Sequence, residues 1–224
     1  MKIIIFDSST IINLAMNGIL DLLRELKKNF KGKFIITKAV KYETIDRPLN
    51  IKKFELGALK IQNLLDDKIL ELPEAISIKD DEIKNKTREL INRINRVFSA
   101  ENEFIHIIDE GEASCLALNL ILENKKIENI IAIDERTTRM LGENPENLHK
   151  LFEKKLHIKI KMFRENIPEI NNIKFIRSSE LVYVAYKKKL VDLKNGKVLD
   201  ALLYATKFKG ASISQEEIEQ IKRL

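Results

Sequence analysis

The sequence has 224 residues, of which 44% are hydrophobic, and a formal net charge of +6. This length and composition allow a substantial buried core, which excludes an intrinsically disordered tail. One cysteine, Cys115, excludes an intramolecular disulfide and suits a reducing cytoplasm. MKIIIF is too short for a signal peptide and no stretch is apolar enough to cross a membrane, so we expect a soluble, cytoplasmic protein without a membrane partner.

Strands alternate with helices along the chain. The apolar run KIIIF at 2–6 predicts a strand buried on both faces, and helical spacing predicts a helix from Ser9 to about Lys28. FIIT at 34–37 predicts a second strand, which leads into a helix that Pro48 ends. The later predictions are helices at 54–65, 80–98 and 109–125, short strands at 68–72 and 130–134, and further helices to the C-terminus. This alternation predicts an α/β fold with a central parallel sheet flanked by helices.

Two of the predicted strands end abruptly on an aspartate. Asp7 follows KIIIF, and Asp134 ends IIAID. Because the carboxyl ends of parallel strands lie on one edge of the sheet, we expect these two side chains to meet there. Either aspartate alone is better explained as the cap of the following helix, but the pair favours a functional site.

Two glutamates are expected to join the aspartates. Glu43 follows apolar residues by one helical turn and shares their inward face, and Glu112 stands at a helix N-terminus beside a buried stripe. Alone, Glu112 would equally be a carboxylate favoured by the helix dipole, and Asp109 and Glu110 look like first-turn acids of that kind or outer members of the patch. Four converging carboxylates repel one another unless cations lie between them. Oxygen ligands without His or Cys suit Mg²⁺ or Mn²⁺.

Basic residues crowd at 23–34, at 149–164 and in AYKKKL, which contains Lys187, Lys188 and Lys189. These lysines are candidate phosphate contacts, although each cluster would equally serve solubility. A polyanion-attracting surface around an acidic metal site predicts metal-assisted cleavage of a phosphodiester.

Four stretches carry a family resemblance: IIIFDSSTIINLA, VKYET, DEGEASCLALNL and IIAIDERTTRML. In this order the chain resembles the PIN-domain family, Mg²⁺- or Mn²⁺-dependent nucleases that include archaeal and bacterial toxin ribonucleases. The resemblance covers the N-terminal two-thirds, and the tail resembles the C-terminal helices of the subgroup with the GEA motif. It implies catalytic, metal-binding acids at Asp7, Glu43, Glu112 and Asp134, a small hydroxyl residue at Ser9, and the subgroup's basic position at Arg139.

The resemblance also implies how the chain is organised. It predicts one PIN-like domain over 1–224 with a mainly helical insertion at about 48–104, because the gap from Glu43 to Glu112 is wide for this family. Arg136 stands where the family often has a further aspartate, which leaves open whether one or two metals bind. A homodimer and an antitoxin protein are possible partners, and helix 80–98 would either form an interface or cover the core.

The leading functional prediction is an endoribonuclease that uses Mg²⁺ or Mn²⁺, with the class of RNA and a toxin or RNA-processing role left open. The alternative is a catalytically silent PIN-like module that binds RNA or protein. A haloacid-dehalogenase-like phosphatase, suggested by FDSST, needs a second aspartate where Ser9 stands.

Overall fold

The computed structural model describes residues 1–170 and 173–223, and its main sheet has four parallel strands in the order β2-β1-β5-β7. These strands are β1 (Lys2–Phe6), β2 (Gly32–Ile35), β5 (Glu128–Ala132) and β7 (Phe175–Ile176). β1 and β5 are apolar runs buried in the middle of the sheet, as parallel packing requires. The predicted α/β fold with a central parallel sheet is confirmed.

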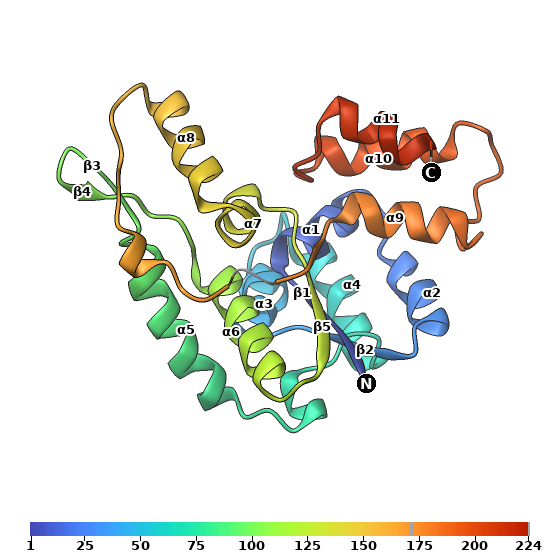
Figure 1. Cartoon of the computed structure of the whole chain (residues 1–224). Coiled ribbons are helices and arrows are strands. Elements are labelled where there is room, and N and C mark those ends of the chain that lie inside the picture. Colours follow the sequence, from blue (N-terminus) through green and yellow to red (C-terminus); the bar gives the residue numbers. More distant parts are fainter. Residues whose placement is uncertain (171–172, 224) are drawn as a thin grey trace.

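Helices cover both sides of this sheet (Figure 1). One side carries α6 with α5 outside it, and the other carries α2 with α9 above it. The α-helices are α1 (Ser8–Met16), α2 (Asp21–Asn29), α3 (Lys38–Lys41), α4 (Glu55–Asp66), α5 (Asp80–Ile94), α6 (Glu110–Asn124), α7 (Arg136–Glu143), α8 (Pro145–Leu156), α9 (Ser178–Lys187), α10 (Val198–Phe208) and α11 (Gln215–Arg223). Short π- and 3₁₀-helices occupy Tyr42–Asp46, Pro48–Asn50, Pro73–Ile76 and Arg164–Asn166.

Several predicted elements differ from the structure. The helix predicted from Ser9 to about Lys28 is two helices, because Gly18 adopts a positive φ of 68° and breaks the chain between α1 and α2. The second strand ends at Ile35 instead of residue 37, since Thr37 already caps the next helix. The strand predicted at 68–72 is a single parallel bridge from Glu71 to Ile35.

The segment at 48–104 contains α4, α5 and a short hairpin. The hairpin strands β3 (Phe98–Ala100) and β4 (Glu103–Phe104) form a small antiparallel sheet with β6 (Lys161–Met162). The helix predicted at 80–98 ends at Ile94, and Phe98 already belongs to β3. α5 packs along α6 through buried residues that include Ile83 and Leu90, so this helix covers the core. The segment's buried side chains belong to the same hydrophobic cluster as those of the main sheet.

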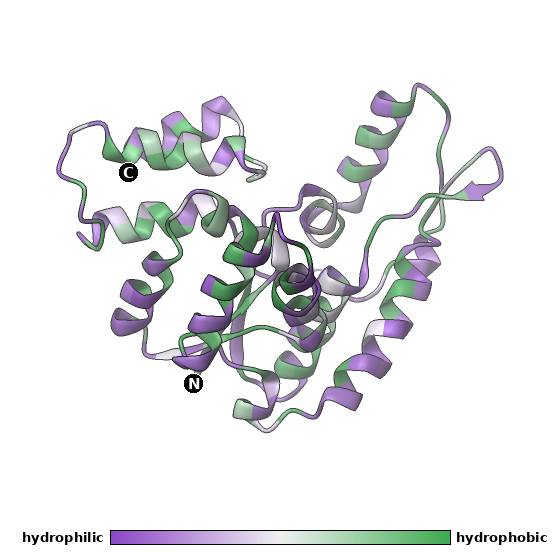
Figure 2. Cartoon of the chain, turned by 180° about the vertical axis from the view of Figure 1, so that it is seen from behind, coloured by the Kyte–Doolittle hydropathy of each residue, from purple (hydrophilic) through white to green (hydrophobic). Residues whose placement is uncertain are grey.

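Hydropathy follows the layers of the fold (Figure 2). Apolar residues colour the central strands, and the outer helices such as α5 show a polar face to solvent and an apolar face to the core. Within the described residues, no helix combines the length and the apolar character needed to span a membrane.

Candidate functional site

The carboxyl edge of the sheet holds both strand-terminal aspartates. β1 pairs with β5 so that Phe6 lies beside Ala132, and the N–H of Asp7 continues this ladder by donating to the carbonyl of Ala132 at 2.9 Å. Asp7 therefore lies beside Ile133, one residue before Asp134. Because successive side chains in extended backbone alternate between the two faces, we infer from this register that the Asp7 and Asp134 side chains point to opposite sides of the sheet.

Asp7 is fully buried and caps helix α1. Its Oδ2 accepts hydrogen bonds from the Ser9 N–H at 2.9 Å and from the Ser9 hydroxyl at 2.5 Å, so Ser9 orients this carboxylate. Its Oδ1 is buried and has no hydrogen-bond partner among the described residues. The pKa of Asp7 is raised from 3.8 to about 6, mainly by burial and to a smaller extent by the charge of Glu43, while the hydrogen bonds from Ser9 lower it. Oδ1 is therefore an acceptor that a bound cation would stabilise.

Glu43 approaches Asp7 from the π-helix (Tyr42–Asp46) that continues α3. Such π turns occur frequently at functional sites, where they reposition side chains. Its carboxylate packs so closely against Gly111 in the first turn of α6 that a methyl group at Gly111 would clash with it. Burial raises the pKa of Glu43, and the charges of Asp109 and Glu110 add to that effect, while bonds from Ser8 and Gly111 lower it.

Glu112 lies in the first turn of α6, as its sequence position predicts. Its Oε2 accepts the N–H of Asp109 at 2.9 Å in a capping box, so it does carry the helix-terminal role considered for it. Burial raises the pKa of Glu112 from 4.5 to about 7, and the charge of Asp7 is the next largest cause. Glu112 and Asp7 therefore share one poorly solvated region of negative charge.

The pKa of the Cys115 thiol responds to the same three acids, Asp7, Glu43 and Glu112. This buried side chain lies one turn after Glu112, and its pKa is raised by burial and then by the charges of Asp7, Glu112 and Glu43. In the described parts of the chain, no three His, Cys, Asp or Glu side chains are already arranged as metal ligands. The carboxylates of Asp7 and Glu112 instead accept hydrogen bonds at the ends of their helices, as repelling groups without a cation would.

Asp134, the fourth predicted acid, turns away from these three. It is buried, and its Oδ1 accepts the Ser178 N–H at 2.7 Å while its Oδ2 accepts from the Ser178 hydroxyl at 2.7 Å and from the Asn13 amide at 2.8 Å. Its own N–H donates to the Ser9 hydroxyl at 3.0 Å. The Asp134 side chain thus joins α1 to α9, and its backbone N–H is linked to Asp7 through the Ser9 hydroxyl.

Glu135 is an acid that the sequence reasoning missed. Its charge contributes to the raised pKa of Glu112, and its Oε2 accepts the Thr138 N–H at 2.6 Å as the cap of α7. Extended backbone places it two positions after Ile133, on the same side of the sheet as Asp7. Asp134 and Glu135 are neighbours in IIAIDERTT, and only the strand register indicates which of the two lies on the side of Asp7.

The predicted basic residues lie apart from the three acids. Arg139 is half-buried against the C-terminal segment, where its Nη2 donates to the Ser212 carbonyl at 3.2 Å. Lys187, Lys188 and Lys189 are exposed at the end of α9, and the ten residues of that helix place them about 15 Å from its first residue, Ser178.

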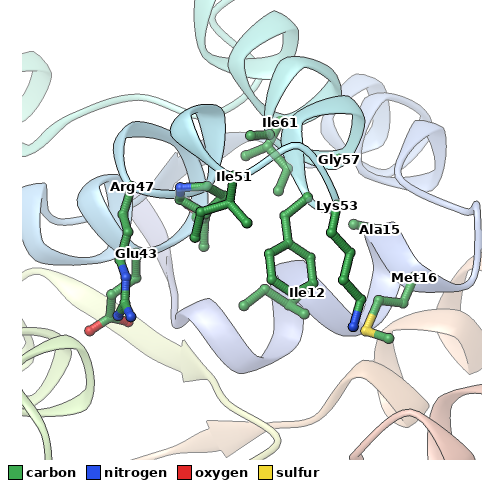
Figure 3. A pocket seen from close by; sticks show the side chains of 13 residues that line it. Ile12, Ala15, Met16, Glu43, Arg47, Ile51, Lys53, Gly57 and Ile61 are labelled. Carbon is green, nitrogen blue, oxygen red and sulfur yellow. The ribbon is translucent and has the colours of Figure 1, made fainter.

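A cavity of about 560 Å³ adjoins Glu43 (Figure 3). Most of its wall is apolar and comes from α1, from α4 and from the turn before α4, including Ile12, Met16 and Phe54. Lys53 also lines it, with its Nζ 5.2 Å from the centre of the Phe54 ring. A ligand bound near the acids would therefore find apolar surface and cationic side chains beside Glu43.

Comparison with known proteins does not extend this description. No family model, no curated protein and no solved structure matches the chain. The acidic group is thus interpreted from its own geometry, and the resemblance to PIN-domain nucleases stays a prediction.

Proposed function

We propose that this protein is a nuclease that hydrolyses RNA phosphodiester bonds with Mg²⁺ or Mn²⁺ held by Asp7, Glu43 and Glu112. The observation that carries the proposal is the buried, unpartnered Oδ1 of Asp7 in a region where burial and nearby negative charges raise the pKa of all three acids. A hard divalent cation relieves both costs, because carboxylate oxygens are its preferred ligands. The resemblance to PIN-domain nucleases supports the same chemistry.

The residues present are suited to such an ion. Asp7 offers one oxygen without a hydrogen-bond partner, and Glu112 has one oxygen outside the capping box. The absence of a side chain at Gly111 leaves room for the Glu43 carboxylate against the first turn of α6. When bound, the ion would neutralise phosphate charge and lower the pKa of a water molecule. Ser9 fixes the Asp7 carboxylate, and the charge of Glu135 adds to the raised pKa of Glu112. Asp134 acts as a positioning residue through α1 and α9.

The substrate assignment rests on the surroundings of the acids. The cavity beside Glu43 has room for an unpaired nucleobase, and the ring of Phe54 offers a stacking surface. Its cations, Arg47 and Lys53, form no ion pair with a carboxylate in the described chain, which leaves them available for phosphates. Single-stranded RNA combines an exposed base with flanking phosphates and fits this arrangement.

Mapping of RNA ends tests the proposal directly. Purified protein should release discrete fragments from a defined single-stranded RNA when Mn²⁺ is present and none when a chelator is added. Hydrolysis by water leaves 5′-phosphate and 3′-hydroxyl ends, whereas attack by the ribose 2′-hydroxyl leaves a cyclic phosphate. Fragments that persist in chelator or carry cyclic phosphate ends would contradict a metal-dependent hydrolase.

A silent module that binds RNA or protein is the second candidate. It is favoured by the capping bonds that engage Asp7 and Glu112, and by the absence among the described residues of three side chains already placed as ligands. Such a module would bind RNA without cleaving it and would respond weakly to divalent ions. Three poorly solvated acids close together lower the stability of the fold, and a binding module has no use for them. This loss of stability favours the enzyme.

Mn²⁺ should raise the melting temperature, and the increase should be larger at pH 8 than at pH 5. The pKa of Asp7 is about 6 and that of Glu112 about 7 in the folded protein, both above their ordinary values of 3.8 and 4.5. The folded state therefore holds more protons than the unfolded state between pH 4 and 7, so metal-free stability falls as pH rises through this range. Cation binding needs the deprotonated acids and offsets that loss. Thermal melts with and without Mn²⁺ measure both effects.

The control melts use buffer without Mn²⁺ or Ca²⁺ at the same ionic strength. They separate specific Mn²⁺ binding from the general screening of charge repulsion by salt. Equal melting temperatures with and without Mn²⁺ at pH 8 would count against a metal site.

Replacing the lysines at 187–189 by glutamine should weaken RNA binding without changing the Mn²⁺ effect. These exposed side chains would contact phosphates, and each lost contact lowers the salt slope of log K by about 0.7 on single-stranded RNA, or about two in total. Titrations of RNA at several salt concentrations measure the slope. A matched variant with glutamine at Lys31, Lys125 and Lys126, which precede strands β2 and β5 at the opposite edge of the sheet, should keep the wild-type slope. Equal losses in both variants would assign the effect to net charge alone.

A further inference from the structure

A second pocket lies beyond Asp134, on the side of α7 and the C-terminal helices. It encloses about 500 Å³ and is lined by Arg136, Arg139, Arg177 and Lys207, with Glu143 and Glu217 as its carboxylates. Four cations against two carboxylates give this pocket an excess of positive charge. Neither the acidic group nor its proposed chemistry uses it.

Arg139 is the anomaly in this pocket. Its Nε is buried without a hydrogen-bond partner among the described residues, and its guanidinium forms no ion pair within that part of the chain. Its single hydrogen bond runs from Nη2 to the Ser212 carbonyl at 3.2 Å. Burial lowers its pKa, and the charge of Arg177 adds to that effect. A half-buried guanidinium with an N–H that has no acceptor lowers the stability of the fold unless an anion binds it.

The neighbouring arginine differs because its charge is satisfied. Arg177 pairs with Glu180, and its Nη1 lies 2.8 Å from Glu217 and 2.9 Å from the Ser212 carbonyl. Glu217 is thereby committed to Arg177 and to the Ser214 N–H. Glu143, the pocket's other acid, acts on Arg139 by its charge but forms no ion pair with it among the described residues. Lys207 and the exposed Arg136 also form no ion pair in that part of the chain.

We propose that this pocket binds a phosphate group, with the Arg139 guanidinium as its central donor and Arg136 and Lys207 at its rim. Guanidinium presents parallel N–H donors that match two oxygens of a tetrahedral phosphate, and Arg139 lines the pocket without a carboxylate partner among the described residues. Polar walls and a net positive charge suit a charged group instead of an apolar one.

The pocket is connected to the acidic group through Asp134. The Asp134 N–H donates to Ser9, which holds Asp7, and the Asp134 carbonyl accepts the Ser212 N–H at 3.3 Å. Ser212 in turn accepts from Arg139. In a nuclease, this adjacency would let one RNA place one phosphate at the acids and another in the pocket, an extension that rests on the proposed function. The phosphate site itself does not.

Titration with inorganic phosphate, without divalent metal, tests the site. The arginine Nε–H resonance that disappears in Arg139→Gln should shift saturably in the wild-type NMR spectrum. Arg139→Gln should lower phosphate affinity about tenfold or more, and Lys207→Gln, at the rim, by up to about fivefold. Arg88→Gln, which removes the same charge from an exposed position on α5, should change nothing. Equal affinity in wild type and Arg139→Gln, or the same shift with chloride, would overturn the proposal.

Two RNA arms identify the source of the phosphate, with Asp7→Asn protein used to keep the RNA intact. Displacement by inorganic phosphate of 5′-phosphorylated RNA but not of 5′-hydroxyl RNA would assign a terminal phosphate, and displacement of both would assign an internal one. RNA binding that inorganic phosphate does not affect would overturn the link to RNA. Because these readouts need no cleavage, they are distinct from a failure of the nuclease proposal.

Discussion

Asp7→Asn should abolish RNA cleavage while making the metal-free protein more stable. Asparagine keeps the size of the side chain and an oxygen that can cap α1, but it removes a charge from the proposed metal site. Loss of that ligand should lower the cleavage rate about a hundredfold or more. RNA affinity measured without metal should hold or rise slightly, because a negative charge facing phosphate has gone.

The gain in stability follows from the pKa of Asp7. Holding a fully buried carboxylate whose pKa is raised from 3.8 to about 6 costs about 3 kcal/mol once it is ionised. A neutral asparagine avoids this cost, so at pH 8 the free energy of unfolding should rise by about 2 to 3 kcal/mol in metal-free urea titrations. At pH 4, where Asp7 is protonated in the folded state, the variant and the wild type should differ little.

The matched control is Asp192→Asn, which removes the same charge from an exposed loop. It should leave cleavage and stability at wild-type levels. Identical RNA degradation by wild type and Asp7→Asn in Mn²⁺ would identify the activity as contamination, and the binding module would then be the better description.

Asp134→Ala should destabilise the fold strongly. The substitution leaves the Ser178 N–H, the Ser178 hydroxyl and the Asn13 amide without their acceptor in a buried site. Since each buried donor left unpaired costs about 1 to 3 kcal/mol, we expect a loss of about 3 kcal/mol or more in the free energy of unfolding. Chemical denaturation measures this loss.

Asp134→Asn separates a structural role from metal binding. It should be less stable than wild type and yet keep the Mn²⁺-induced rise in melting temperature. Glu112→Gln should show the reverse: no loss of stability in the metal-free protein at pH 8, because the pKa of Glu112 is raised as that of Asp7 is, and no Mn²⁺ effect. An Asp134→Asn protein with wild-type stability and no response to Mn²⁺ would restore Asp134 to the metal ligands that the sequence predicts.

The sequence by itself determined the architecture and most of the acidic group's location. The apolar run KIIIF makes β1 a buried strand, and the following polar residues begin a helix, so Asp7 has to lie at the sheet edge. Glu112 follows from the N-terminal signals of α6, and Glu43 from its helical spacing behind apolar residues. These are local patterns with a fixed period, and a single stretch of chain contains all of their information.

Only the tertiary structure decided which acids face one another and where the arginines go. The pairing of Phe6 with Ala132 places Asp134 one residue out of step with Asp7, and in backbone of period two that single step moves a side chain to the other face. It also puts Glu135 on the side of Asp7. Register depends on contacts between strands more than a hundred residues apart, as does the meeting of Arg139 with the carbonyl of Ser212. No local pattern encodes such contacts, because they are set by how the whole core packs.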